Sequence, residues 1–209
     1  MLYIRKKRPP GTFIQYRKTP QATYDGMDTD VKDSLRTALL VEQGYLCAYC
    51  MTPLEDAHDK VKIEHYAPRS PSNELVYKNL LAVCCGNEGT PAKEQTCDTH
   101  KGNIILRIDP QNEGHIAQIT YDGSGEISCK DEQLKEDLDK TLNLNCPRLK
   151  SARQQVLKAF FAVMSKDKQG KTASKAYLEK KLEYYRERRN DRLSPYCGIL
   201  IYYLQRRIR

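Results

Sequence analysis

The pattern of apolar and polar residues along this chain predicts a mostly helical protein. Over residues 29–43, apolar side chains recur at helical spacing, which places them on one face. Asp28 or Thr29 can cap the start of this helix, and Gly44 can end it because glycine readily adopts the left-handed conformation. The same spacing predicts further helices over residues 131–143, 149–163, 172–190 and 195–207, with a polar break at residues 168–171.

Strand signals are fewer and shorter. Residues 61–68 alternate in polarity and end at a proline, which predicts one short strand. Glu64 and His65 fall on opposite faces of it, and both can reach one cleft only if the backbone bends there. Residues 115–121 and 126–129 flank an Asp-Gly-Ser-Gly turn and predict a hairpin. The expected fold class is therefore α+β, mostly helical.

These elements divide the chain into four parts. Residues 1–26 contain three prolines and are expected to form an extended basic arm. Residues 27–108 hold the candidate metal ligands and form the expected core. Residues 109–130 are the hairpin connection, and residues 131–209 are a basic, helical C-terminal region.

Cysteines form two groups that predict a zinc site. Cys47 and Cys50 have the Cys-x-x-Cys spacing that lets two sulfurs bind one metal ion. Zinc in structural sites takes four ligands, so a second pair is needed, and Cys84 with Cys97 is assigned, with Cys85 in reserve for Cys84. The alternatives are small buried hydrophobic residues or a redox pair. The flanking sequence lacks the strand-then-helix setting of a redox motif, which favours zinc.

Glu64 and His65 suggest a second and different metal site. Hydrolysis of a phosphodiester needs an activated water and a cation at the scissile phosphate. A neutral histidine suits the general base near physiological pH, and a carboxylate suits Mg²⁺ or Mn²⁺. His65 is therefore the candidate base and Glu64 a candidate ligand of the catalytic metal. Alone, such a dipeptide is usually a surface pair.

Together with the sequence Cys-Asp-Thr-His-Lys-Gly at residues 97–102, this dipeptide resembles the HNH nucleases. The resemblance implies a small ββα-metal core whose helix begins at this sequence. It implies Asp98 as the second ligand of the catalytic metal, with His100 as the competing candidate, and Lys101 as a contact to a substrate phosphate. Asn79 would be the middle residue of the HNH pattern and would fix the loop that carries His65; the alternative is an ordinary cap.

The resemblance extends beyond these motifs. Leu46-Cys-Ala-Tyr-Cys, Ile63-Glu-His-Tyr-Ala-Pro and Asn79-Leu-Leu-Ala-Val-Cys are similar to the nuclease subunit of the Septu anti-phage system, the PtuB family, which is also found beside retrons. The family implies an ABC-type ATPase partner of the PtuA kind and a role in defence against phage. The chain has no Gly-x4-Gly-Lys-Ser/Thr loop of its own.

Charge and composition agree with an enzyme that binds nucleic acid. Residues 1–20 carry six Lys or Arg and no acid, residues 147–209 have a net charge of +12, and residues 21–146 have −10. Basic ends can hold a phosphate backbone, although charged helices often simply face water. No run of 18 apolar residues predicts a membrane span, no signal peptide is expected, and zinc-type cysteine spacing favours the reducing cytoplasm.

The sequence therefore predicts a metal-dependent HNH endonuclease with structural Zn²⁺ and catalytic Mg²⁺ or Mn²⁺. DNA is the favoured substrate, with RNA left open. The alternative is a zinc-stabilised adaptor that binds nucleic acid or protein without cutting it. Residues 1–12, apolar and then basic, are expected to be a docking peptide for the ATPase; a loose tail, or a strand packed on its own domain, is the alternative.

Overall fold

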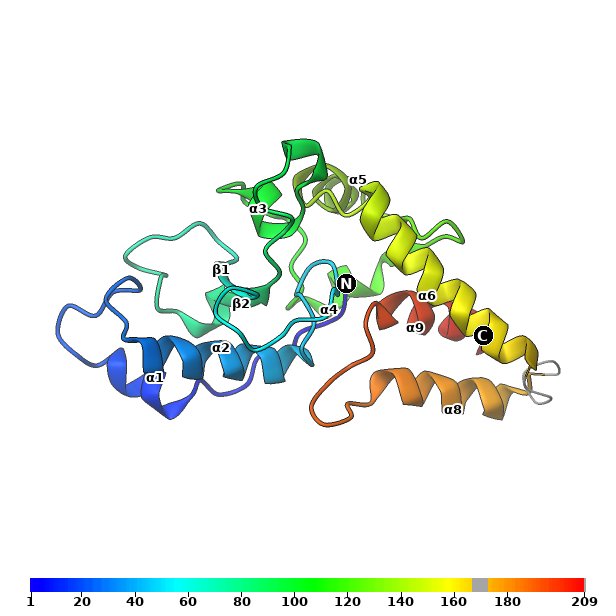
Figure 1. Ribbon diagram of the computed structural model, residues 1–209, viewed down its shortest axis with the longest axis horizontal. Helices are drawn as coiled ribbons and strands as arrows, with labels where there is room; N and C mark the ends of the chain where they lie inside the picture. The colour runs from blue at the N-terminus through cyan, green and yellow to red at the C-terminus, as the bar shows by residue number, and fades with distance from the viewer. Residues whose placement is uncertain (167–172, 209) are drawn as a thin grey trace.

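Helix α2 (Thr29–Gln43) underlies the N-terminal half of the computed structural model, which describes residues 1–166 and 173–208 (Figure 1). Its bounds confirm the helix predicted from the apolar spacing. Asp28 occupies the N-cap position, and Gly44 ends the helix in the left-handed region at φ 66°. Leu35, Leu39 and Leu40 on its inner face are fully buried.

A two-stranded antiparallel sheet packs on α2. Strand β1 (Lys62–His65) pairs with β2 (Leu80–Val83), which follows the 3-10 turn η1 (Tyr77–Asn79). The buried Gln43 side chain binds β2, because its Oε1 accepts from Ala82 N at 2.8 Å and its Nε2 donates to Ala82 O at 2.7 Å. The end of α2 thereby satisfies backbone groups that a two-stranded sheet would leave unpaired.

The chain then reaches a short helix through a turn-rich insert. The 3-10 turn η2 (Ala92–Glu94) lies in the insert, and α3 (Cys97–Lys101) follows. Gly86 is needed here: its φ is 58°, and a Cβ would lie 2.2 Å from Thr96 O. Thr96 N donates to Gly86 O at 2.8 Å, which closes the insert and returns Cys97 to the end of β2.

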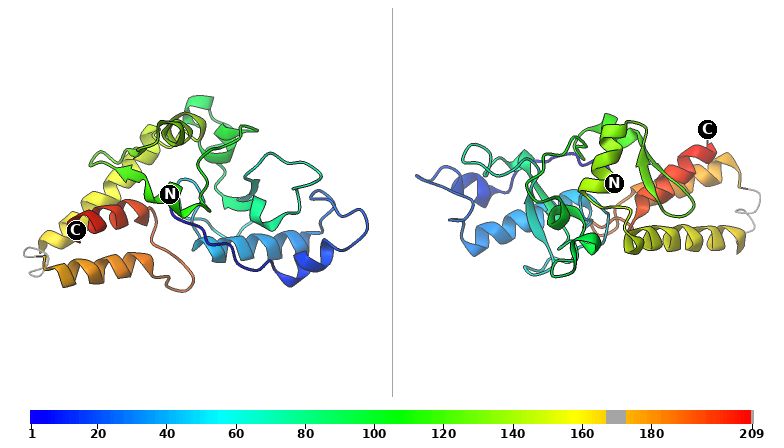
Figure 2. Two further views of the ribbon diagram at one scale, coloured as in Figure 1. Left: turned by 180° about the vertical axis from the view of Figure 1, so that it is seen from behind. Right: turned by 90° about the horizontal axis from the view of Figure 1, so that it is seen from above.

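The C-terminal half is mainly helical (Figures 1 and 2). Its elements are α4 (Glu113–Ala117), β3 (Ile119–Tyr121), β4 (Ile127–Cys129), α5 (Glu132–Glu136), the π-helical turn η3 (Asp137–Thr141), α6 (Pro147–Lys166), α8 (Lys175–Arg186) and α9 (Cys197–Ile208). Helix α9 packs against α6, α8 and β3, and the antiparallel hairpin of β3 and β4 packs on α5 and η3.

Several element boundaries differ from those predicted, among them the end of α8 at Arg186 instead of residue 190, and three of the differences have a local cause. The segment expected to begin a strand at residue 115 starts as helix α4, because the Asn112 side chain caps it by accepting from His115 N at 3.2 Å. The helix expected over residues 131–143 changes to a π turn at Asp137, whose carboxylate accepts from Ile108 N at 2.9 Å. Helix α9 begins at Cys197, because Tyr196 has a positive φ of 53°. The predicted polar break at residues 168–171 lies outside the described residues.

The N-terminal segment is part of the core, contrary to the docking peptide expected from its sequence. It runs from the centre of the molecule to α1 (Gly11–Tyr16), which interrupts the extended arm predicted over residues 1–26 (Figure 2). Met1 and Ile4 are buried, and Ile4 N donates to Pro110 O at 2.8 Å. The apolar side chains at this end are thus covered by the chain's own core, as in the alternative of a segment packed on its own domain.

A buried ion pair fixes this segment to α2. The Lys6 ammonium lies 2.9 Å from the Glu42 carboxylate, and their side chains are only 6% and 1% exposed. The other Glu42 oxygen accepts from Lys7 N at 2.5 Å and from the Tyr77 hydroxyl at 3.4 Å. Glu42 therefore holds the segment, α2 and η1 together.

Replacing Glu42 should destabilise the protein strongly. Glu42→Ala leaves the Lys6 ammonium buried without a counter-ion, which costs about 3–5 kcal/mol of unfolding free energy. Asp59→Ala is the control, because the Asp59 side chain is 74% exposed in its ion pair with Lys60 and should contribute about 0–1 kcal/mol. Denaturant unfolding measures the free energy of unfolding of both variants. Equal decreases would show that the buried Lys6–Glu42 pair stabilises the protein no more than an exposed pair does.

Within the described residues, no helix has the length and apolar character that crossing a membrane requires.

Candidate metal centre and active site

Cys47 and Cys50 lie in a tight loop directly after α2. Leu46 and Pro53 form a bridge that closes the loop, and Cys47 N donates to Thr52 O at 2.9 Å. Thr52 N in turn donates to the Cys50 sulfur at 3.5 Å. These bonds turn both sulfurs inward, and both residues are buried.

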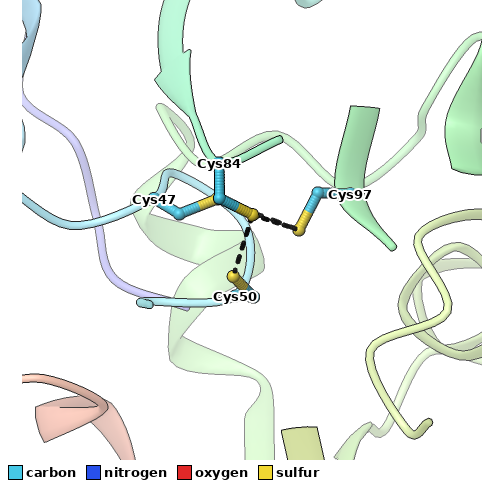
Figure 3. A group of neighbouring side chains, drawn as sticks. All are labelled: Cys47, Cys50, Cys84 and Cys97. Atoms are coloured by element: carbon cyan, nitrogen blue, oxygen red, sulfur yellow. Dashed lines mark hydrogen bonds between the residues drawn. The ribbon is translucent and has the colours of Figure 1, made fainter. Parts of the chain in front are cut away.

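The second pair of sulfurs comes from β2 and α3. Cys84 follows the last residue of β2, and Cys97 is the first residue of α3 (Figure 3). Cys97 has a φ of 57°, in the left-handed region that is costly for a residue other than glycine. Its N–H donates to Leu142 O at 2.9 Å, so the C-terminal half helps hold this conformation.

The four sulfurs of Cys47, Cys50, Cys84 and Cys97 have the spacing of a tetrahedral zinc site. All lie within 4.8 Å of one another, and three sulfur pairs are separated by 3.7 or 3.8 Å. Zinc–sulfur bonds of about 2.3 Å in a tetrahedron put neighbouring sulfurs roughly 3.8 Å apart. The cluster could therefore hold a metal ion such as zinc.

Cys85 lies apart from this cluster. Its thiol donates to Asp59 O at 3.4 Å. Of the two adjacent cysteines, Cys84 is thus the one whose sulfur joins Cys47, Cys50 and Cys97. Within the cluster, burial raises the pKa of the Cys47 thiol, whereas hydrogen bonds from the neighbouring thiols lower the pKa of Cys50.

A cavity of about 430 Å³ lies beside the cysteine cluster. Glu64 and His65 at the end of β1 line it together with Asp98 of α3. The two consecutive strand residues reach the same cavity because the chain leaves the sheet after His65. Asp98 directly follows Cys97, so the position of Cys97 in the cluster also sets the position of this carboxylate.

Glu64 is the most buried acidic group of the cavity, with 6% of its surface exposed. Its Oε1 accepts from the Lys101 ammonium at 2.7 Å and from the Tyr49 hydroxyl at 3.3 Å. Burial and the neighbouring Asp98 carboxylate raise the pKa of Glu64 to about 8, although Lys101 opposes this shift. Two carboxylates facing each other in a partly closed cavity offer the oxygen ligands that Mg²⁺ and Mn²⁺ prefer.

His65 is held by a backbone carbonyl and an aromatic ring. Its Nε2–H donates to Glu74 O at 3.0 Å when the ring is neutral, which leaves Nδ1 with a free lone pair. The Tyr24 ring packs edge-on against the imidazole, with 4.6 Å between the ring centres. Burial lowers the pKa of His65, which favours the neutral form that a base requires.

Asn79 lies outside the cavity and binds the loop that follows His65. Its side-chain Oδ1 accepts from Ala67 N at 2.8 Å, and its Nδ2 donates to Ala67 O at 3.1 Å. Asn79 O also accepts from Tyr66 N at 2.8 Å. The amide thus binds the loop directly and does not line the cavity.

His100 and Lys101 make contacts that differ from those expected. The Nδ1 of His100 is bonded to Thr141 O at 3.0 Å, and the residue does not line the cavity with Glu64. The Lys101 ammonium was expected to meet a substrate phosphate. Its side chain lines the cavity but is only 1% exposed, and its ammonium is paired with the Glu64 carboxylate at 2.7 Å.

Two residues that contact Glu64 or His65 were not predicted from the sequence. Tyr49, inside the Cys-x-x-Cys loop, reaches Glu64, and Tyr24 supports His65 from a segment far away in the sequence. The position of Tyr49 between Cys47 and Cys50 of the cluster is a sequence signal for this contact. Nothing in the local pattern around Tyr24 indicates its contact with His65.

Two proteins of known type are similar to this chain. Over 202 residues it is 26% identical to a retron Ec83 protein of Escherichia coli, provisionally named as an HNH endonuclease, and the match covers 75% of this chain and 74% of that protein. Over 125 residues it is 26% identical to the Septu protein PtuB of Bacillus thuringiensis, and the match covers 58% of this chain and 48% of that protein. No protein-family model matches the chain.

These relatives connect the chain to the HNH nucleases. Within that class, they support a nuclease of the PtuB type, in agreement with the resemblance in the sequence motifs.

Proposed function

We propose that this protein is a metal-dependent HNH endonuclease that hydrolyses phosphodiester bonds in nucleic acid. The observation that carries the proposal is the meeting of Glu64, His65 and Asp98 in one cavity beside a cluster of four cysteines. A binding module has no need of two carboxylates converging with a neutral imidazole. Strands β1 and β2 followed by α3 supply the order of elements that a ββα-metal core requires.

Two kinds of metal ion serve different purposes in this proposal. Cys47, Cys50, Cys84 and Cys97 would hold zinc, which would stabilise the fold and fix the start of α3. Glu64 and Asp98 would hold a Mg²⁺ or Mn²⁺ ion, which would stabilise charge on the scissile phosphate as a Lewis acid.

His65 is the proposed general base. The Glu74 carbonyl holds the proton on Nε2, so Nδ1 accepts a proton from the attacking water. Asn79 fixes the loop after His65 through Ala67, which keeps the imidazole in place. Lys101 holds the Glu64 carboxylate and is a positioning residue in this scheme, in place of the phosphate contact first expected.

The relatives suggest the biological setting. Their names connect them to a retron and to Septu. We propose that the chain acts in defence against phage, together with an ABC-type ATPase of the PtuA kind, and that DNA is its substrate in preference to RNA.

Asp98 and His100 provide the direct test of the metal site. Asp98→Ala should lower metal-dependent cleavage on the order of 100-fold or more, because a metal ion contributes several kcal/mol to the transition state. His100→Ala should cost less than about tenfold, since its ring is bonded to Thr141 O and lies outside the cavity.

The measurement is the cleavage rate of both variants over a Mn²⁺ titration. Zinc content by elemental analysis serves as the control for folding. A larger loss in His100→Ala than in Asp98→Ala would move the ligand to His100 and would contradict the proposed site.

A further inference from the structure

The N-terminal segment has two faces with different chemistry. Ile4 is buried, and the Lys6 ammonium forms an ion pair with Glu42. Tyr3, Arg5 and Lys7, which alternate with these two residues, are exposed. This is the alternation of an extended chain lying on a surface. The inward side chains anchor the segment, so the outward side chains are held in fixed positions rather than on a loose tail.

Two hollows lie along the outward face. The first, about 580 Å³, is lined by Tyr3, Arg5, Val76 and Lys78 among others, and we call it the arm hollow. The second, about 450 Å³, is lined by residues of the same segment, Lys7 and Arg8, and by residues of α2. The N-terminal segment therefore runs past both hollows and contributes cations to each.

The charge along this surface is strongly positive and unpaired. Among the described residues, Arg5, Lys7, Arg8 and Lys78 form no ion pair. Asp109 supplies the one carboxylate among the residues that line the two hollows, and it is turned to its own loop, where it accepts from Gln111 N at 2.7 Å. Such a surface complements a polyanion.

The arm hollow also exposes apolar surface. Tyr3 is 43% exposed and Val76 is 39% exposed, although both are large apolar side chains. An aromatic ring beside unpaired cations is the arrangement that binds a nucleic-acid strand, because a base stacks on the ring while the cations contact phosphates.

The arm hollow adjoins the loop that follows His65. Ala67 and Asn79 line it, and Asn79 holds the backbone of Ala67, two residues after His65. A nucleic-acid strand in the arm hollow would therefore contact the loop that directly follows His65, the proposed base.

We infer that the outward face of residues 3–8, together with Lys78, binds one strand of the nucleic-acid substrate beside the catalytic cavity. Phosphates contact Arg5, Lys7 and Lys78, and one base stacks on Tyr3 against Val76. This inference rests on the proposed nuclease function and adds to it a substrate surface outside the HNH motifs. It replaces the ATPase-docking role expected for the segment.

Charge removal tests the phosphate contacts. Arg5→Gln with Lys78→Gln, in a His65→Ala background that prevents cleavage, should weaken binding of fluorescein-labelled single-stranded DNA or RNA about tenfold or more. The slope of log affinity against log salt should become shallower by about 1.4, which is about 0.7 for each phosphate contact on a single strand. Lys158→Gln with Lys180→Gln, on exposed faces of α6 and α8, is the matched control and should change neither quantity.

Tyr3→Ala tests the stacking contact separately. It should weaken binding about 5- to 100-fold without changing the salt slope, because it removes a base contact and no charge. Fluorescence anisotropy measures each affinity, parallel arms with DNA and RNA identify the preferred strand, and thermal unfolding confirms that the variants fold.

Three results would overturn the inference. Unchanged affinity and slope in the charge variants would remove the surface from substrate binding, and the nuclease proposal would stand if the wild-type chain still cleaves. An equal loss of affinity in the control variant with Lys158→Gln and Lys180→Gln would show general electrostatic attraction of the nucleic acid instead of binding at a defined surface. Unchanged nucleic-acid binding with loss of a complex with the ATPase subunit would make the surface a protein-docking site.

Discussion

His65→Ala is expected to abolish cleavage while leaving the protein folded. Loss of a general base costs on the order of 100- to 10,000-fold in rate. The imidazole contacts the Glu74 carbonyl and the Tyr24 ring and is only half-buried, so its removal should leave the cysteine cluster and the core intact. The measurement is the single-turnover rate of cleavage together with zinc content and the melting temperature.

His58→Ala is the matched control for this experiment. His58 is exposed and lies in a neighbouring hollow that Asp98 also lines, but it does not line the cavity with Glu64 and makes no hydrogen bond among the described residues to Glu64, His65 or Asp98, so its loss should leave the rate within about threefold of wild type. Full activity of the His65→Ala protein would remove His65 from the mechanism. A fall in zinc content and melting temperature equal to the fall in rate would instead give His65 a structural role.

Cys47→Ser is expected to have the largest effect on folding. Removing one of four thiolates should release zinc, and the loss of several kcal/mol of metal-linked folding free energy should lower the melting temperature roughly 10 °C or more. Cys47 is buried where α2 ends, so the damage should spread to β2 and α3, which the cluster joins. Elemental analysis and thermal unfolding measure the two effects.

Cys85→Ser provides a close comparison, because Cys85 adjoins Cys84 in sequence but lies outside the cluster. Its thiol contacts only the Asp59 carbonyl among the described hydrogen bonds. The variant should retain about one zinc ion per chain and unfold near the wild-type temperature. If Cys85→Ser lost zinc and Cys84→Ser retained it, Cys85 and not Cys84 would be the zinc ligand.

Local sequence patterns predicted the elements that depend on neighbouring residues. Helix α2 has the predicted bounds because its apolar spacing and its terminal glycine agree, although Asp28 at the N-cap position makes no side-chain capping hydrogen bond. The assigned cysteines meet because the two pairs flank β1 and β2, and the pairing of these strands brings their flanks together. The local pattern predicted only the strand that carries Glu64 and His65, whereas the helix that carries Asp98 was expected from the resemblance to HNH nucleases and β2 was not predicted.

Long-range contacts account for most of what the sequence left unseen. The burial of Ile4 depends on Pro110, and the Lys6 ion pair depends on Glu42, so a basic segment that reads as a loose arm is part of the core. The sequence predicts Lys101 to be a cation that contacts a phosphate, but in the structure its ammonium forms an ion pair with the buried Glu64 carboxylate. Periodicity and spacing carry no information about such partners.

Glu64, His65 and Asp98 are proposed to form a metal-dependent site for phosphodiester cleavage. The test is to incubate the purified chain, with and without the proposed ATPase partner, with supercoiled plasmid and total RNA, and to add Mg²⁺ or Mn²⁺ or no divalent ion. Cut products should require the added ion and disappear with Glu64→Gln, which removes the carboxylate charge but keeps a hydrogen-bond acceptor beside the buried Lys101 ammonium. Wild-type cleavage in a folded Glu64→Gln protein, or no cleavage of either nucleic acid under any of these conditions by the zinc-loaded wild-type protein, would contradict the proposed site.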